Sequence, residues 1–213
     1  MFDHQATLTR TLDSRLVAIL RTPTAEPLMP AMKAIAAGGI DVIEITMTVP
    51  GAITAIEKAR DEFGDSIVLG AGSVVDAETA RACMLAGAEF VVSPVVRRDV
   101  IDACKRYGAV VMPGALTPTE VLDAWEAGAD VVKVFPANVV GGPKYIKALK
   151  APMPQVRLMP TGGVNKVTIS DFFAAGASAV GMGSCLLSAS ILDEADWDAL
   201  QQLAAHFVRL AST

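Results

Sequence analysis

Apolar stretches of strand length recur along the chain, with helix-like segments between them. The apolar stretches cover residues 16–21, 40–46, 66–72, 89–94, 109–114, 130–136, 156–163 and 179–184. The intervening segments are alanine-rich and carry apolar residues at helical spacing, as in AMKAIAA, AETARACMLA and PTEVLDAWEA. Strict alternation of strand and helix predicts βαβ units and a parallel sheet.

Eight such units in 213 residues are typical of a small barrel of alternating strands and helices. We therefore expect residues 1–213 to form a single-domain α/β protein, a (β/α)8 TIM barrel with an N-terminal helical extension. A doubly wound open sheet is the alternative. Neither a linker nor a low-complexity segment interrupts the pattern.

A shorter repeat lies within this pattern. The segments GIDVIEIT (39–46), GAEFVVSP (87–94), GADVVKVF (128–135) and GASAVGMG (176–183) align without gaps. Each begins with a glycine after an alanine-rich segment, which predicts the C′ cap of a helix leading into a strand. These segments introduce the second, fourth, sixth and eighth strands, whose side chains would share interior layers in a barrel.

The sixth position of this alignment holds Glu44, Val92, Lys133 and Gly181. Side chains alternate along a strand, so this position lies on one face in every copy. We expect Lys133 and Glu44 to share an interior layer, with the small Gly181 leaving room between them. Positions two residues later, which include Pro94, Phe135 and Gly183, would lie at the carboxyl rim where such barrels build active sites.

Lys133 is a lysine within an otherwise apolar, β-branched run. Burial favours the neutral amine, which can attack a carbonyl carbon to form a Schiff base. Glu44 is then the candidate proton shuttle, since the two histidines, His4 and His206, lie near the termini. A structural Lys133–Glu44 ion pair is the competing interpretation, although such pairs often fail to repay their desolvation.

Glycine-containing turns follow the last two predicted strands, in PTGGV (160–164) and GMGSC (181–185). Loops at these places commonly bind phosphate through backbone N–H groups. Thr161, Gly162, Gly163, Gly183 and Ser184 are small and rich in donors, which suits that role. A simple tight connection would explain the glycines equally well.

Composition narrows the partners and the compartment. A net charge of −5 and a pI near 5.0 disfavour nucleic acid and acidic membranes as partners. The N-terminus is polar and lacks the apolar core of a secretory signal. Three unclustered cysteines predict free thiols in a reducing compartment, so we expect a cytoplasmic protein. The scarcity of histidine disfavours a metal site, and we expect neither a metal nor a cofactor.

Seven short stretches carry a resemblance to a known family. In chain order they are EITMT (44–48), GAGSV (70–74), SP (93–94), MPG (112–114), VKVFPA (132–137), PTGGV (160–164) and GS (183–184). Together they resemble motifs of the 2-keto-3-deoxy-6-phosphogluconate (KDPG) and 2-keto-4-hydroxyglutarate (KHG) aldolases. The resemblance runs from about residue 16 to the final helix.

The resemblance implies a metal-free class I aldolase that cleaves a 2-keto-3-deoxy sugar acid phosphate to pyruvate and glyceraldehyde 3-phosphate. It implies a homotrimer, with Lys133 as the Schiff-base lysine and Glu44 as the acid/base. The implied keto-acid pocket comprises Ser73, Pro94, Phe135 and Thr161, and the implied phosphate site comprises Gly162, Gly163 and Ser184.

Two positions depart from the family pattern. Many members carry an arginine four residues after the glutamate, where this chain has Thr48, and a threonine at the position of Ser73. We hypothesise that Arg21, at the end of the first predicted strand, binds the substrate carboxylate instead. A surface arginine in a loop is the alternative for Arg21.

Other functions remain open on the sequence alone. The same scaffold could cleave the galactonate epimer or unphosphorylated 4-hydroxy-2-oxoglutarate. A metal-dependent phosphosugar epimerase would need histidines and aspartates at strand ends, whereas a non-catalytic phosphometabolite-binding barrel would not need Lys133.

Overall fold

The computed structural model describes residues 3–212 of the chain. The strands are β1 (Leu16–Leu20), β2 (Val42–Thr46), β3 (Val68–Gly72), β4 (Phe90–Val92), β5 (Val110–Met112), β6 (Gly114–Ala115), β7 (Val132–Val134), β8 (Leu158–Pro160) and β9 (Val180–Met182). The α-helices are α1 (His4–Ser14), α2 (Leu28–Ala37), α3 (Ala52–Phe63), α4 (Ala77–Leu85), α5 (Arg98–Tyr107), α6 (Pro118–Glu126), α7 (Pro143–Lys150), α8 (Ile169–Ala174), α9 (Ala189–Glu194) and α10 (Trp197–Ala211). Two short 3-10 helices, η1 (Gly64–Ser66) and η2 (Ala137–Val140), lie in connections.

The strands are parallel and curl around a common centre, and they form two hydrogen-bonded sets, here called runs. One run has the order β5-β4-β3-β2-β1-β9, and the other has the order β6-β7-β8. The predicted strand at 109–114 is divided into β5 and β6 on either side of Pro113, which has no N–H to donate. The predicted α/β architecture with parallel strands is confirmed, although most strands are shorter than the apolar stretches that predicted them.

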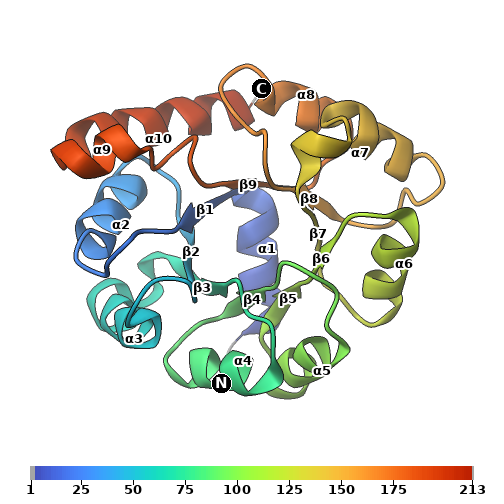
Figure 1. Cartoon of the computed structure of the whole chain (residues 1–213), viewed down its shortest axis with the longest axis horizontal. Coiled ribbons are helices and arrows are strands. Elements are labelled where there is room, and N and C mark those ends of the chain that lie inside the picture. Colours follow the sequence, from blue (N-terminus) through green and yellow to red (C-terminus); the bar gives the residue numbers. More distant parts are fainter. Residues whose placement is uncertain (1–2, 213) are drawn as a thin grey trace.

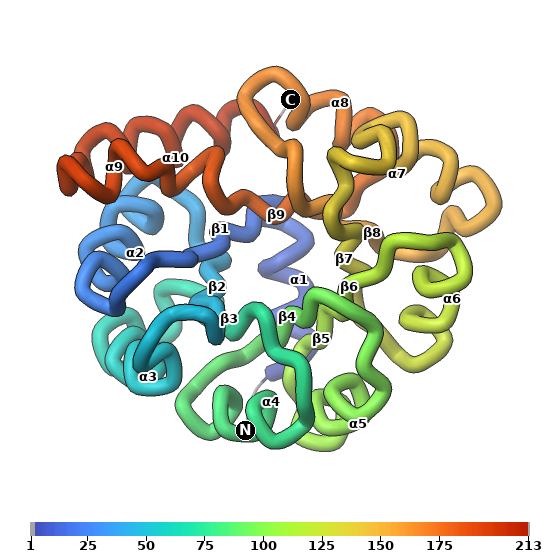
Figure 2. The backbone as a smooth tube through the Cα atoms, in the orientation of Figure 1, coloured from blue at the N-terminus to red at the C-terminus, as the bar shows by residue number. Residues whose placement is uncertain are grey.

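Apart from α1, the α-helices form an outer ring around the strands (Figure 1). Successive strand–helix units follow one another around the centre, so the last long helix, α10, packs beside α2 (Figure 2). An extensive apolar layer fills the space between the strands and these helices. Within residues 3–212, none of the helices combines the length and the apolarity needed to cross a bilayer.

Four glycines end helices at the starts of the repeated segments. Gly39, Gly87, Gly128 and Gly176 all have positive φ, between 94° and 111°. The residue after each glycine donates its N–H to the carbonyl five residues earlier, as Ile40 does to Ile35. These are the bonds of a Schellman cap, so the C′ caps predicted from the repeat are confirmed.

Helix α1 lies across the amino ends of the strands, behind them in the view of Figure 1. Leu8 of α1 packs on a core inside the curled sheet that includes Val17, Val68 and Phe90. This core fills the amino-terminal part of the interior. Space for a ligand is therefore left at the carboxyl ends of the strands.

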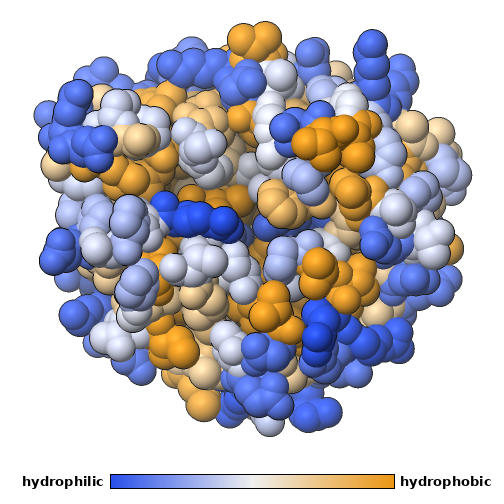
Figure 3. Space-filling model, viewed as in Figure 1, coloured by the Kyte–Doolittle hydropathy of each residue, from blue (hydrophilic) through white to orange (hydrophobic). Residues whose placement is uncertain are grey.

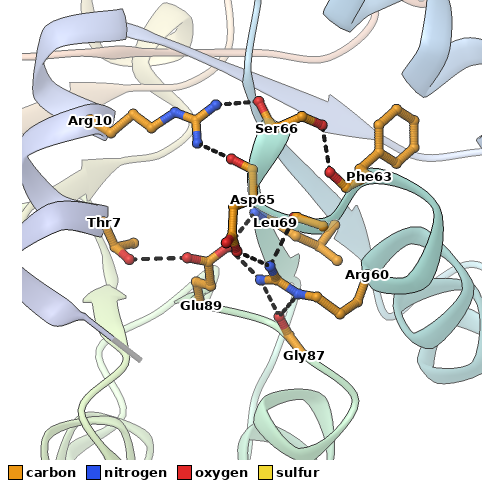
Figure 4. A network of polar contacts seen from close by, with 10 residues as sticks. Thr7, Arg10, Arg60, Phe63, Asp65, Ser66, Leu69, Gly87 and Glu89 are labelled. Carbon is orange, nitrogen blue, oxygen red and sulfur yellow. Dashed lines mark hydrogen bonds and ion pairs between the residues drawn. The ribbon is translucent and has the colours of Figure 1, made fainter. Parts of the chain in front are cut away.

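Polar contacts fasten α1 to the strand starts (Figure 4). Thr7 donates its hydroxyl hydrogen to the carboxylate of Glu89, which also forms an ion pair with Arg60. Arg10 donates to the carbonyls of Asp65 and Ser66. The contacts of Glu89 are partly buried and those of Arg10 are exposed, and together they hold α1 beneath the interior of the sheet.

Candidate active site

A cavity of about 340 Å³ opens among the carboxyl ends of the strands. The space-filling view is hollowed near its centre, where hydrophobic and strongly hydrophilic residues meet (Figure 3). The cavity is lined by Ile19, Arg21, Ser73, Pro94, Lys133, Phe135, Thr161, Gly162, Gly183, Ser184 and Leu187. Nine of these lining residues are candidates from the sequence, drawn from segments scattered over the whole chain.

Lys133 lies at the centre of β7 and presents its amine to this cavity. Only 5% of the residue is exposed. Its Nζ lies 4.9 Å from the centroid of the Phe135 ring, two residues further along the same strand direction. Burial lowers the pKa of Lys133, and the positive charge of Arg21 lowers it further, while Glu44 opposes the shift. The site therefore favours the neutral, nucleophilic amine.

Glu44 lies at the centre of β2 and is 1% exposed. Neither carboxylate oxygen has a hydrogen-bond partner within the described residues. Burial raises the pKa of Glu44 above 4.5, against the opposing effects of the Lys133 and Arg21 charges. A carboxyl group with a raised pKa can hold a proton and release it during a reaction.

Lys133 and Glu44 each change the other's pKa, so they lie close enough to interact electrostatically. In both cases burial is the largest cause and it favours the neutral form. Within residues 3–212, no hydrogen bond joins the side chains of Lys133 and Glu44. A buried ion pair without such a bond does not repay its desolvation, so a purely structural ion pair is disfavoured. A neutral amine beside a protonatable carboxyl group suits proton-assisted attack on a carbonyl.

Arg21 follows β1 and Ser73 follows β3, and the two side chains meet. Nη2 of Arg21 donates a hydrogen bond to Oγ of Ser73 at 3.1 Å. Ser73 has a φ of 59°, a left-handed conformation that is strained for a residue with a side chain. The guanidinium is exposed at the cavity mouth, where a substrate carboxylate could reach it.

Thr48 lies apart from this cavity. Its hydroxyl is 2.8 Å from that of Thr46 at the end of β2, and the residue is exposed and absent from the cavity lining. Among the residues that line the cavity, Arg21, which follows another strand, is the only arginine.

Thr161 follows β8 and its buried Oγ1 has no hydrogen-bond partner within residues 3–212. A Cβ on Gly181 would lie 2.3 Å from this oxygen and 3.1 Å from Cδ1 of Ile19. The space above Gly181 is thus filled by Thr161 and Ile19, rather than left open between Lys133 and Glu44 as the sequence predicted. The unpaired hydroxyl is available to a ligand in the cavity.

Four of the five residues suited to bind phosphate line the same cavity: Thr161, Gly162, Gly183 and Ser184. Gly163 does not; it packs against Asn138, whose Cβ would lie 2.6 Å from a Cβ at this glycine. The carbonyl of Gly163 accepts a hydrogen bond from Thr168 Oγ1 at 2.7 Å. Gly162 and Gly163 both have positive φ, so the turn requires glycine.

Sequence reasoning missed two lining residues, Ile19 and Leu187. Ile19 lies on β1, two residues before Arg21, which directly follows the strand. Strand alternation places both side chains on the same face. That signal was present in the sequence. Leu187 lies in the irregular segment between β9 and α9, where no periodic pattern exists to indicate a direction.

The sequence of the chain is similar to those of known aldolases. A family model for KDPG and KHG aldolase matches residues 8–203. The 2-dehydro-3-deoxy-6-phosphogalactonate aldolase of Escherichia coli (strain K12) is 36% identical over 175 residues, covering 82% of this chain and 85% of that protein. The 2-dehydro-3-deoxy-phosphogluconate aldolase of Pseudomonas aeruginosa is 31% identical over 191 residues, covering 90% and 86%.

Among solved structures, the KDPG aldolase from Legionella pneumophila superposes with a TM-score of 0.86 at 28% identity. The match covers 95% of this chain and 97% of that chain. In that crystal structure, pyruvate is captured at low pH as a covalent carbinolamine intermediate.

Proposed function

This chain belongs to the KDPG and KHG aldolase family, and from that premise we propose that its cavity cleaves a 2-keto-3-deoxy-6-phospho sugar acid to pyruvate and glyceraldehyde 3-phosphate by Schiff-base chemistry. Membership makes it a carbon–carbon lyase. The observation that carries the proposal is Lys133, a lysine with a lowered pKa whose amine faces the cavity close to Glu44.

The reaction follows from the two side chains. The neutral Nζ of Lys133 attacks the C2 keto carbon, and Glu44 gives its proton to the hydroxyl of the carbinolamine, which leaves as water; a protonated imine and the Glu44 carboxylate remain. Glu44 takes the proton of the C4 hydroxyl as the C3–C4 bond breaks, and the bonding electrons pass into the imine to form an enamine. The aldehyde leaves and Glu44 returns its proton to C3. Water then attacks the resulting imine and gives a proton back to Glu44, and collapse of the carbinolamine releases pyruvate and the neutral amine.

The remaining candidates have separate roles in this proposal. Arg21 binds the substrate carboxylate in place of the arginine that Thr48 replaces, and its contact with Ser73 supports this assignment. Pro94, Phe135 and the unpaired hydroxyl of Thr161 surround the keto-acid carbons. The phosphate site comprises Gly162, Gly163, Gly183 and Ser184, with Gly163 acting through the shape of the turn.

Trapping with borohydride tests the mechanism directly. The protein is incubated with pyruvate and sodium borohydride, digested, and analysed by mass spectrometry. We expect a reduced pyruvate adduct on Lys133. In Lys133→Ala, we expect both the adduct and the aldol cleavage activity to be lost. Lys33→Ala and Lys147→Ala are matched controls, because both lysines are exposed on helices, and each should retain the adduct. An adduct on another lysine, or none, would contradict the assignment.

The galactonate epimer is a second candidate substrate, favoured by the 36% identical relative that is named for it. The epimers differ in configuration at C4, the carbon whose hydroxyl proton Glu44 takes in the proposed reaction, so the placement of groups around this carbon decides which epimer is cleaved. Steady-state kinetics with both phosphorylated epimers and with 4-hydroxy-2-oxoglutarate decide between them. The preferred substrate is the one with the highest kcat/KM.

We further propose that the two sheet runs form one closed (β/α)8 barrel domain spanning the chain, with α1 as its N-terminal helical extension. Hydrogen bonds across both gaps support closure. The N–H of Lys133 donates to the carbonyl of Pro113, and Thr161 forms a bridge with Gly181. A crystal structure tests the closure, and one cooperative unfolding transition would support a single domain.

We also propose a cytoplasmic homotrimer, as the family resemblance implies. The three cysteines are free, which suits a reducing compartment. Val75, Val95 and Val139 are exposed apolar residues, and a neighbouring copy would cover such residues. Light scattering coupled to gel filtration measures the oligomeric state, and a monomer mass would contradict the trimer.

A further inference from the structure

Gly72 ends β3 directly beside the strand that carries Glu44. In the parallel pairing of β2 and β3, Thr46 is the partner of Gly72 and Glu44 is the partner of Gly70. The Glu44 side chain extends toward the carboxyl end of its strand, which brings its carboxylate over Gly72. Gly72 is itself fully within the buried part of β3.

The carboxylate of Glu44 occupies the space that a side chain at position 72 would need. A Cβ on Gly72 would lie 2.1 Å from Oε1 of Glu44 and 2.7 Å from its Cδ. Gly72 is not among the glycines with positive φ, so its backbone would accept alanine without strain. Space for Glu44, rather than backbone conformation, therefore accounts for glycine at this position.

We propose that Gly72 is a positioning residue for the aldolase reaction, because its missing side chain determines where the carboxylate of Glu44 lies relative to the amine of Lys133. The inference rests on the proposed function of Glu44 and extends it to the neighbouring strand. An alanine here would displace the carboxylate, because the end of a flexible side chain yields more easily than the backbone of a buried sheet. A displacement of about 1 Å in a catalytic group can reduce turnover by about 100-fold.

Gly70 provides a matched contrast on the same face of the same strand. A Cβ there would lie 2.2 Å from the ring of Phe90, a fully buried aromatic residue in the core below the site. A rigid ring in close packing cannot move aside cheaply. Gly70→Ala should therefore reduce stability without displacing Glu44, whereas Gly72→Ala should displace Glu44 with a smaller loss of stability.

The first experiment compares these two variants by kinetics and thermal unfolding. We expect Gly72→Ala to lower kcat by at least tenfold with KM within about threefold of wild type, and to shift the acid limb of the kcat–pH profile. We expect Gly70→Ala to lower Tm more than Gly72→Ala while keeping kcat within about threefold. A folded Gly72→Ala enzyme with wild-type kcat and pH profile would overturn the proposal.

The second experiment measures stability alone, so it does not depend on the proposed function. Gly72→Ala is made in the wild-type and in the Glu44→Ala background. We expect alanine at position 72 to lower Tm, or to prevent folding, only when Glu44 is present, because Glu44→Ala removes the atoms that it would meet. An equal penalty in both backgrounds would show that Gly72 does not serve Glu44. If instead Lys133 traps no pyruvate while the penalty depends on Glu44, the proposed chemistry fails and the packing relation stands.

Discussion

Arg21 donates a hydrogen bond from Nη2 to Oγ of Ser73 at 3.1 Å, joining residues that follow two different strands at the mouth of one cavity. Arg21 also affects the charges deeper in the site, since its cation lowers the pKa of Lys133 and opposes the raised pKa of Glu44. One exposed arginine is thus placed to bind a substrate anion and to favour the neutral lysine.

Arg21→Met should raise KM for the keto-acid substrate by about 10-fold to 100-fold. A hydrogen bond to a charged group contributes about 1.5–3 kcal/mol, and 1.4 kcal/mol corresponds to a factor of ten. Steady-state kinetics provide the measurement. Arg98→Met, which removes an arginine with a side chain 70% exposed on α5, is the control and should leave KM unchanged. An unchanged KM in Arg21→Met would mean that another group binds the carboxylate.

Ser73→Gly should be more stable than Ser73→Ala. Both variants lose the hydroxyl, so the difference between their free energies of unfolding measures the strain of a Cβ at a φ of 59°. The left-handed conformation costs residues with a Cβ about 1–2 kcal/mol, partly offset by the greater freedom of glycine in the unfolded chain. Urea unfolding should show a difference of about 0.5–1 kcal/mol in favour of glycine. Equal stability would indicate that the left-handed backbone is not strained.

Glu44→Gln should become more stable than the wild type as the pH rises. Burial raises the folded-state pKa of Glu44 above its ordinary value of 4.5, so the native state binds a proton more tightly than the unfolded state. The wild type therefore loses stability as pH increases from 4.5 through the raised pKa, whereas glutamine has no proton to lose. Melting temperatures should nearly coincide around pH 4.5 and separate by pH 8. A difference that shrinks with rising pH would contradict the burial of an unpaired carboxylate.

Ser184→Ala should reduce kcat/KM for a phosphorylated substrate by about 10-fold to 100-fold, the effect of losing one hydrogen bond to a charged group. The same variant should leave kcat/KM for 4-hydroxy-2-oxoglutarate unchanged, because that substrate has no phosphate. Ser190→Ala is the control, since Ser190 is exposed and its hydroxyl lies 2.9 Å from that of Ser188, outside the cavity lining. Equal losses with both substrates would place Ser184 elsewhere in the reaction.

Asp130→Ala should destabilise the protein by about 2–4 kcal/mol while leaving kcat unchanged. The Asp130 carboxylate accepts hydrogen bonds from the buried N–H of Val111 at 2.9 Å and from Lys105 at 2.9 Å, and it contacts His4 on α1 at 3.0 Å. These contacts lie at the amino end of β7, away from the cavity. Asp102→Ala, at an exposed helix position, is the control in chemical denaturation. A loss below about 0.5 kcal/mol would show that other groups satisfy Val111.

Much of the fold was predictable because its signals are local. Alternating apolar and alanine-rich segments reflect strand and helix burial, and the glycines that end four helices reflect a backbone conformation that glycine adopts most easily. Strand boundaries were less predictable: the division at Pro113 depends on how neighbouring strands pair, which a single apolar stretch does not reveal.

The burial of Lys133 and Glu44 was predictable for the same local reason, since each residue lies inside an apolar stretch of strand length. The sequence by itself determined the alternation of strands and helices and the burial of Lys133 and Glu44 within strands. Only the tertiary structure decided that Arg21 meets Ser73, that Thr161 fills the space above Gly181, and that the carboxylate of Glu44 lies over Gly72. These contacts join residues far apart in the chain, and they depend on strand register and on the curl of the sheet. Neither property is encoded in the local pattern of any one segment.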